Sequence, residues 1–133
     1  MVKIIEDETC HMCIQKETID HMLWECIAVG SFWNSVETLL KKKVDDNIQI
    51  NKKEVFLGLE GHPKESVINH VLLCAKHYLY KNRSLKRKPA LNSFERYLSK
   101  TILNEKSYYT YINKIHVFNV KWCDLLYLCN LYS

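Results

Sequence analysis

Residues 65–83 read ESVINHVLLCAKHYLYKNR, and this stretch decides the class of the fold. Its apolar residues recur every three or four positions, the spacing that places side chains on one face of an α-helix. The apolar residues of that face are Ile68, Val71, Leu72, Ala75, Tyr78 and Leu79. The same period recurs from Phe32 to Leu40 and from Leu91 to Ile102. The sequence therefore predicts a mainly α protein built as a helical bundle.

The segments between these helices carry weaker signals. A short helix is expected from Thr18, its N-cap, to near Cys26. The helix that includes Phe32–Leu40 should end in three lysines, which suit the negative end of the helix dipole. In the second half, periodicity predicts a basic connector at 84–89 and a last helix from Asn104 to Trp122. Ile48 and Ile50 alternate, so the stretch before Pro63 is expected as loop with a short strand or turn at most.

Composition narrows the class of protein. The chain has 133 residues, of which 47% are hydrophobic and 26% charged, with 3 Gly and 2 Pro. These values fit one ordinary domain, or a small metal-stapled module joined to a helical one, and argue against collagen or low-complexity sequence. The longest apolar run, Val71–Ala75, is far shorter than the roughly 20 residues of a membrane-spanning helix. The first residues turn acidic and lack the apolar core of a secretory signal. We therefore expect an intracellular protein, cytoplasmic or nuclear, with no membrane partner.

Four residues near the start form the pattern that points most clearly to chemistry. Cys10, Cys13, His21 and Cys26 have the spacing C-x2-C-x7-H-x4-C. A CxxC loop can turn both sulfurs inward, and a histidine and a cysteine at the two ends of a short helix can close a tetrahedron around Zn²⁺. Because reducing compartments keep thiols free, metal ligation is favoured over disulfides. Four protein ligands leave no position for water, so the zinc would be structural. A thioredoxin-like redox CxxC is the alternative, but the βαβ context that it needs is absent.

Charge is distributed unevenly along the chain. Residues 1–60 carry 7 lysines against 11 acidic residues, a net charge of −4, whereas residues 61–133 carry 12 basic against 4 acidic residues, a net charge of +8. All eight tyrosines lie at position 78 or later. Basic residues interleaved with aromatic ones are typical of nucleic-acid-binding surfaces. The residues predicted to contact nucleic acid are Lys76, Lys81, Arg83, Lys86, Arg87, Lys88, Arg96 and Lys100. Tyr78 and Tyr97 lie in phase with the apolar stripe and are expected in the core. The alternatives for the basic surface are a solvated helix pair, or a face that binds an acidic protein partner.

The cysteine-rich segment also resembles a known family. The sequence CHMC at 10–13, ETIDHMLWEC at 17–26 and the pair Phe32-Trp33 is similar to the zinc-binding segment that follows the reverse transcriptase in LINE-type (non-LTR) retrotransposon polyproteins. That family typically reads C-x2-C, then E-[ST]-[IV]-x-H-[LM]-[FL]-x-x-C, then F-W. A less specific likeness extends over residues 8–122 and includes the FLGL segment at 56–59 and the AKHYLYK helix at 75–81. The resemblance implies the C-terminal part of such a polyprotein, which would engage template RNA or target DNA in target-primed reverse transcription. Other domains of the polyprotein would then be partners, in a cytoplasmic ribonucleoprotein or in the nucleus.

Other reactive patterns have simpler interpretations. His70, Cys74 and His77 share one side of a predicted helix but lack a fourth ligand in phase, so half-exposed side chains are expected rather than a second metal site. Asp45-Asp46 lies in a polar turn and not on the apolar hairpin of a polymerase site. Nothing orients a cysteine–histidine pair for hydrolysis. Cys123 and Cys129 are expected as small buried apolar residues.

These observations combine into one expectation. We predict a mainly α chain in which a small Cys₃His zinc module docks on a helical bundle. Residues 1–45 would form the zinc module with its following helix, 46–63 a connector, and 64–133 a basic helical region. The function predicted is non-catalytic, zinc-stabilised nucleic-acid binding, and the alternative is a protein-interaction module with a structural zinc and a basic face.

Overall fold

The computed structural model describes residues 18–132, and these are mainly helical, with no strand among them. The predicted fold class is thus confirmed at the level of mainly α. Cys10 and Cys13 lie outside the described residues, so the zinc module stays a prediction. The elements in chain order are η1 (His21–Glu25), α1 (Ile27–Lys43), α2 (Lys52–Leu57), α3 (Glu65–Ser84), α4 (Leu91–Tyr111), α5 (Ile115–Trp122) and α6 (Tyr127–Leu131).

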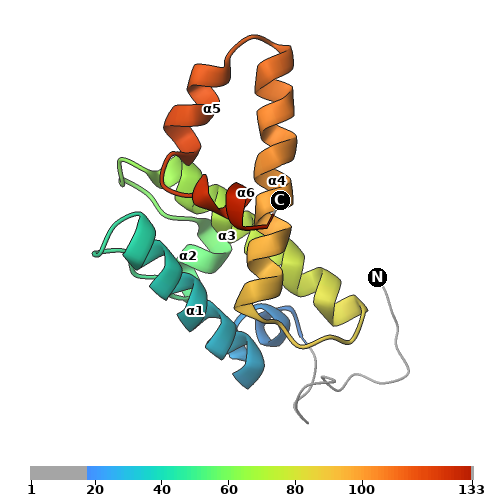
Figure 1. Cartoon of the computed structure of the whole chain (residues 1–133). Helices are drawn as coiled ribbons and strands as arrows, with labels where there is room; N and C mark the ends of the chain where they lie inside the picture. Colours follow the sequence, from blue (N-terminus) through green and yellow to red (C-terminus); the bar gives the residue numbers. More distant parts are fainter. Residues whose placement is uncertain (1–17, 133) are drawn as a thin grey trace.

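The core lies where α1, α3 and α4 meet (Figure 1). Phe32 of α1 packs against Tyr78 of α3 and Phe94 of α4, with ring centroids 5.4 Å apart in both pairs. The Phe32–Phe94 pair is edge-to-face, a geometry that contributes about 0.5–1.5 kcal/mol beyond the apolar area it buries. One continuous hydrophobic cluster extends from Cys26 to Leu128, so the short terminal helices share the core of the long ones.

The N-terminal helical segment begins as the sequence predicts. The Thr18 hydroxyl accepts a hydrogen bond from the backbone N–H of His21 at 3.0 Å, the contact expected of an N-cap. The five residues of η1 form a π-helix rather than an α-helix. The buried Trp33 of α1 donates from Nε1 to the Leu23 carbonyl oxygen at 2.7 Å. This bond ties η1 to α1.

The stretch at 46–63 differs from the prediction, because it contains the helix α2 and no strand. Asn51 and Glu54 form a capping box at its start, in which the backbone N–H of Asn51 donates to Glu54 Oε1 at 2.9 Å. Val55 anchors the helix in the core with 0% exposure. The Asn-x-x-Glu signature was present in the sequence, but the helix is too short for its apolar residues to show a helical period.

The helix predicted from Asn104 to Trp122 is also different, because α4 continues to Tyr111 and α5 begins only at Ile115. Asn113 adopts a left-handed backbone with φ 60°, and the N–H of Lys114 bonds the carbonyl of Tyr109 at 2.8 Å. This is a Schellman end, which asparagine tolerates better than most residues. The chain therefore reverses, and α4 and α5 form a hairpin that projects from the body (Figure 1).

The connector between α3 and α4 is confirmed and is held at both ends. After α3, Lys86 has φ 57° and the N–H of Arg87 bonds the Asn82 carbonyl at 2.8 Å, again a Schellman end. Before α4, the hydroxyl of Tyr78 contacts both the N–H and the carbonyl oxygen of Ala90 at 3.1 Å. The connector is thus a fixed loop whose side chains at 86–88 are exposed.

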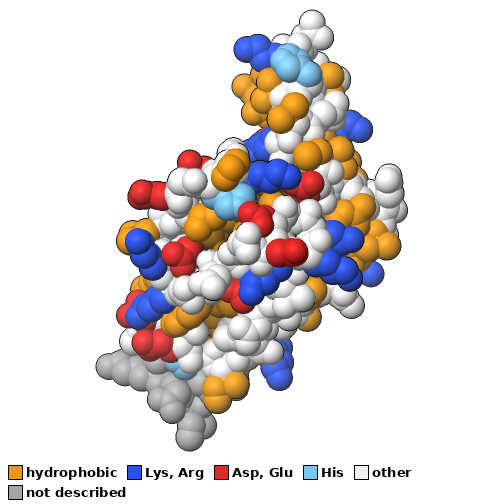
Figure 2. Space-filling view, turned by 90° about the vertical axis from the view of Figure 1, so that its left-hand side faces the viewer, with side chains coloured by type: hydrophobic (Ala, Val, Ile, Leu, Met, Phe, Trp, Pro, Cys, Tyr) orange, Lys and Arg blue, Asp and Glu red, His pale blue; other side chains and the backbone are white. Residues whose placement is uncertain are grey.

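The surface seen in Figure 2 mixes acidic and basic side chains over the body, while the projecting α4–α5 end carries exposed hydrophobic ones. In the α4–α5 hairpin, Tyr111 is 88% and Val120 77% exposed. In the part of the chain that the structure describes, no helix has the length and apolar character needed to cross a bilayer.

Candidate metal centre and basic face

The two described members of the predicted zinc set lie at the two ends of η1. His21 is 4% exposed and Cys26 is 1% exposed, so both are buried although each is a polar or reactive residue. The backbone N–H of Cys26 bonds the His21 carbonyl at 3.0 Å, which closes the π-helical turn between them. A buried thiol and a buried imidazole on one short turn are the donor types that a structural zinc site uses.

The other two predicted ligands, Cys10 and Cys13, are outside the described residues. Within 18–132 no group of three His, Cys, Asp or Glu side chains is placed to hold a metal ion. Since only half of the predicted ligand set falls in that range, the test of the site has to be chemical. Around it, Lys52 of α2 reaches Asp20 at 3.4 Å and Glu25 at 3.9 Å, so the acidic rim of η1 is paired with α2.

The eight residues predicted to contact nucleic acid lie on three consecutive segments, and we call them the basic face. Lys76, Lys81 and Arg83 are on the last turns of α3, three more are on the connector, and Arg96 and Lys100 are on the first half of α4. Because α3 and α4 are joined by the connector and pack together, these segments meet at one end of the pair (Figure 1). All are exposed except Lys76 and Arg83, which are half-buried.

The charges of this face are largely uncompensated. Apart from Arg83, none of the eight forms a salt bridge with any residue in the range 18–132. Three acidic residues are paired away from this face: Asp45 with His62 at 2.7 Å, Asp124 with Lys64, and Glu105 with Lys121 at 2.9 Å. A set of cations without carboxylate partners attracts polyanions, because no internal pair has to be broken for binding.

The tyrosines of this region divide into core and surface. Tyr78 is buried at 5% exposure, as predicted for a core residue. Tyr97 is half-buried; its hydroxyl bonds Nδ1 of His77, and Lys81 Nζ lies 5.8 Å from its ring centroid. Burial raises the pKa of Tyr97, so its hydroxyl stays protonated at neutral pH. Tyr80, in contrast, is 53% exposed between Lys76 and Lys81 on α3, where its ring can stack on a base.

Helix α3 carries a charged network that the sequence did not predict. Nδ1 of His70 lies 2.9 Å from Lys121 Nζ and 3.4 Å from Glu105 Oε2, and the His70 ring lies 5.1 Å from the ring of Trp122. Burial lowers the pKa of His70, and the charge of Lys121 lowers it further. These residues are far apart in the sequence, so no spacing signal could have revealed the group. It links α3, α4 and α5.

The structure also gives the exposure of the other cysteines and of two histidines on α3. Cys74 is buried at 7% exposure, so the prediction of a half-exposed side chain was wrong for this residue. His70 is half-buried and His77 is exposed. Cys123, predicted to be buried, is exposed, because it lies just after α5 with its side chain away from the core. Cys129 is half-buried.

Comparisons with protein-family models, with curated proteins and with solved structures gave no match.

Proposed function

We propose that this chain is a non-catalytic nucleic-acid-binding domain stabilised by structural zinc. In this proposal it is the C-terminal part of a LINE-type reverse transcriptase polyprotein, acting inside the cell and engaging template RNA or target DNA. The observation that carries the proposal is the basic face: apart from Arg83, its cations form no salt bridge within residues 18–132, while Asp45, Asp124 and Glu105 are paired elsewhere. The family assignment rests on the cysteine–histidine motif and on its likeness to that family.

The connector gives the basic face its shape. Arg87 and Lys88 stand on a loop that is fixed at Asn82 and at Tyr78, so binding phosphate does not have to order the loop. Lys81 and Lys100 flank it on α3 and α4. Each phosphate neutralised by such a side chain releases condensed counterions, which is the main source of sequence-independent affinity. Exposed Tyr80 would add stacking on unpaired bases.

Zinc would serve the fold rather than a reaction. Cys10, Cys13, His21 and Cys26 would hold it, and a closed set of three thiolates and one imidazole leaves no position at which water could be activated. The burial of His21 and Cys26 fits that donor set. Structural zinc contributes on the order of 10 kcal/mol to folding in finger-sized peptides. Metal analysis of the Cys26→Ser variant should show loss of stoichiometric zinc, whereas the Cys123→Ser variant should keep it. Equal zinc content in both variants would refute the ligand assignment.

The binding function is tested by electrophoretic mobility titration of the whole chain with RNA and DNA, single-stranded and duplex, at two salt concentrations. Binding that weakens steeply with salt is expected on at least one of these probes. If an acidic peptide binds instead and no nucleic acid does, the chain is a protein-interaction module. Incubation with labelled nucleic acids, Mg²⁺ and nucleotides should leave every substrate intact.

A further inference from the structure

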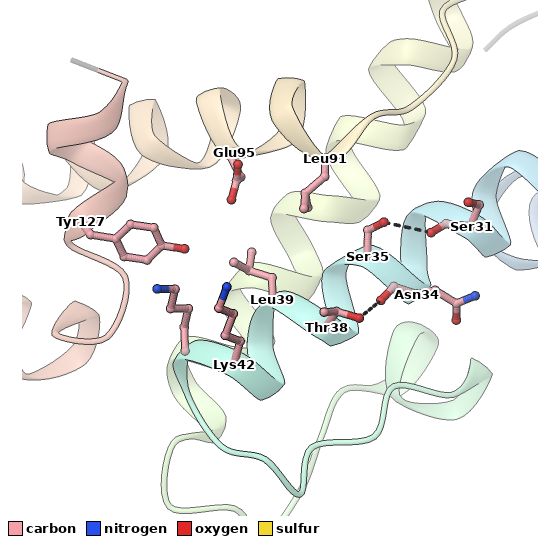
Figure 3. Close-up of a pocket in the computed structure, with 10 residues that line it drawn as sticks. Ser31, Asn34, Ser35, Thr38, Leu39, Lys42, Leu91, Glu95 and Tyr127 are labelled. Atoms are coloured by element: carbon pink, nitrogen blue, oxygen red, sulfur yellow. Dashed lines mark hydrogen bonds between the residues drawn. The ribbon is translucent and has the colours of Figure 1, made fainter.

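A groove runs along the exposed side of α1. It consists of two adjoining hollows of about 580 and about 480 Å³, which share Ser31, Ser35 and Leu91 in their walls. Helix α1 forms one wall, the end of the connector and the start of α4 form the other, and Tyr127 of α6 closes the far end (Figure 3).

The α1 wall is lined by hydroxyl and amide side chains. Ser31, Asn34, Ser35 and Thr38 follow one another along it (Figure 3). Thr38 donates from Oγ1 to the Asn34 carbonyl at 2.9 Å, and Ser35 donates from Oγ to the Ser31 carbonyl at 3.3 Å. These hydroxyls keep lone pairs for a ligand and can rotate to donate. Such short polar side chains are the ones that contact the sugars and phosphates of nucleic acids.

Cations stand at both ends of the groove. Lys88 lies at the connector end, and Lys42 and Lys43 lie at the α6 end. None of the three forms a salt bridge within residues 18–132, and Lys43 Nζ lies 4.5 Å from the ring centroid of Tyr127. The acid in the lining is Glu95, whose Oε1 accepts a hydrogen bond from the Tyr132 hydroxyl at 2.8 Å.

Tyr127 adds a polar group at the closed end. Its hydroxyl points into the hollow between α1 and α4 (Figure 3). Burial, with a smaller effect of Glu95, raises the pKa of Tyr127 to about 12. The group is therefore protonated at neutral pH and can donate a hydrogen bond.

We propose that this groove holds the sugar–phosphate backbone of a single, unpaired strand that continues from nucleic acid bound at the basic face. The inference rests on the proposed function and extends it. Lys88 belongs both to the basic face and to the groove, so the two surfaces are continuous. The 17 residues of α1 span roughly 25 Å, a length that suits the shorter single-strand sites of about 4 nucleotides.

The width of the groove favours one strand over two. Phe32 on α1 and Phe94 on α4 are in contact in the core, with ring centroids 5.4 Å apart, so the two helices that form the walls pack against each other. Packed helices have axes about 8–10 Å apart, whereas the major groove of a duplex alone is about 12 Å wide. A double helix is wider than this spacing and does not enter between the two walls, so the proposal assigns the groove to a single strand.

The test compares two threonines in the same local setting. Thr38 and Thr110 are both exposed and both bond the carbonyl four residues earlier, at 2.9 and 2.8 Å, but only Thr38 lies in the groove. Fluorescence anisotropy would measure binding of a labelled single strand and of a blunt duplex by the whole chain. Thr38→Glu should weaken single-strand binding about 3-fold or more and leave duplex binding unchanged, because the new carboxylate repels a phosphate in the groove. Thr110→Glu should change neither.

A second pair of variants uses charge. Lys42→Glu should lower the salt slope of single-strand binding by about 0.7, the value for one phosphate contact, whereas Lys53→Glu on α2 should not. The groove proposal would be refuted if Thr38→Glu and Lys42→Glu bound the single strand as the wild type does. It would also be refuted if these variants weakened binding of the blunt duplex as much as binding of the single strand. If the unaltered chain binds neither probe, the proposed function itself fails. If duplex binding still depends on the connector while both groove variants bind the single strand normally, only the groove is refuted.

Discussion

Replacing each of two buried tryptophans by phenylalanine tests how η1 is held on α1. Trp33 is 2% exposed and donates from Nε1 to the Leu23 carbonyl of η1 at 2.7 Å. Trp122 is 0% exposed, and its Nε1 has no hydrogen-bond acceptor among the described residues. The two substitutions remove the same atoms from equally buried sites, so Trp122→Phe is the matched control for Trp33→Phe.

The expected difference follows from the hydrogen bond. Both variants lose part of a buried ring and its dispersion energy, a cost common to the pair. Trp33→Phe also leaves the Leu23 carbonyl without its partner, while Trp122→Phe removes a buried N–H that had none. A net hydrogen bond of this kind contributes about 1 kcal/mol, and stranding one partner adds to the loss. Trp33→Phe should therefore lower the free energy of unfolding by about 1–2 kcal/mol more than Trp122→Phe.

Urea unfolding followed by far-UV circular dichroism measures this difference. With a denaturant slope of about 2 kcal/mol/M, the midpoint of Trp33→Phe should lie about 0.5–1 M below that of Trp122→Phe. Equal midpoints, or a lower midpoint for Trp122→Phe, would show that the bond to Leu23 does not hold η1 on α1.

Two further predictions concern the backbone and the pH response. Lys86→Gly should raise the free energy of unfolding by about 1 kcal/mol, because Lys86 has φ 57° and glycine adopts that backbone conformation without strain. Thermal unfolding measures the change, and a melting temperature below that of the wild type would contradict this prediction. The pKa of His70 is lowered by burial from 6.5, so the unfolded chain takes up a proton first as pH falls. The stability that neutral His70 provides is therefore present above about pH 6.5 and is lost as pH falls through its folded-state pKa. The urea midpoint of the unaltered chain should fall as pH drops below about 6.5, and it should fall less in His70→Gln; an equal fall in the two proteins would refute this prediction.

Much of the bundle could be predicted because long amphipathic helices repeat their signal over several turns. In α3 the period continues from Ile68 to Leu79, and the structure buries that face. Helix ends that depend on a single residue were not predicted from the periodicity. Asn113 ends α4 through a left-handed backbone, while the apolar period continues on both sides of it. The short helix α2 depends on its capping box and on Val55, which periodicity does not report.

The candidate site shows the same limit. The basic residues were predictable because they are close in sequence, and the structure brings them to one end of α3 and α4. That the basic residues other than Arg83 form no salt bridge within residues 18–132 was not predictable, since it depends on ion pairs such as Asp124 with Lys64, which are 60 positions apart. The groove on α1 was also missed, because its walls come from three segments of the chain.

The central claim is tested most directly by reversing charge at the connector against a control of equal charge. The variant Arg87→Glu/Lys88→Glu should bind duplex DNA more weakly, with the log–log salt slope reduced by about 0.9 for each phosphate that the protein no longer neutralises. The control Lys53→Glu/Lys114→Glu changes two exposed lysines outside the basic face and carries the same net charge. It should bind with nearly the wild-type affinity and slope. Equal weakening by the two double variants, or none by the connector variant, would contradict the account.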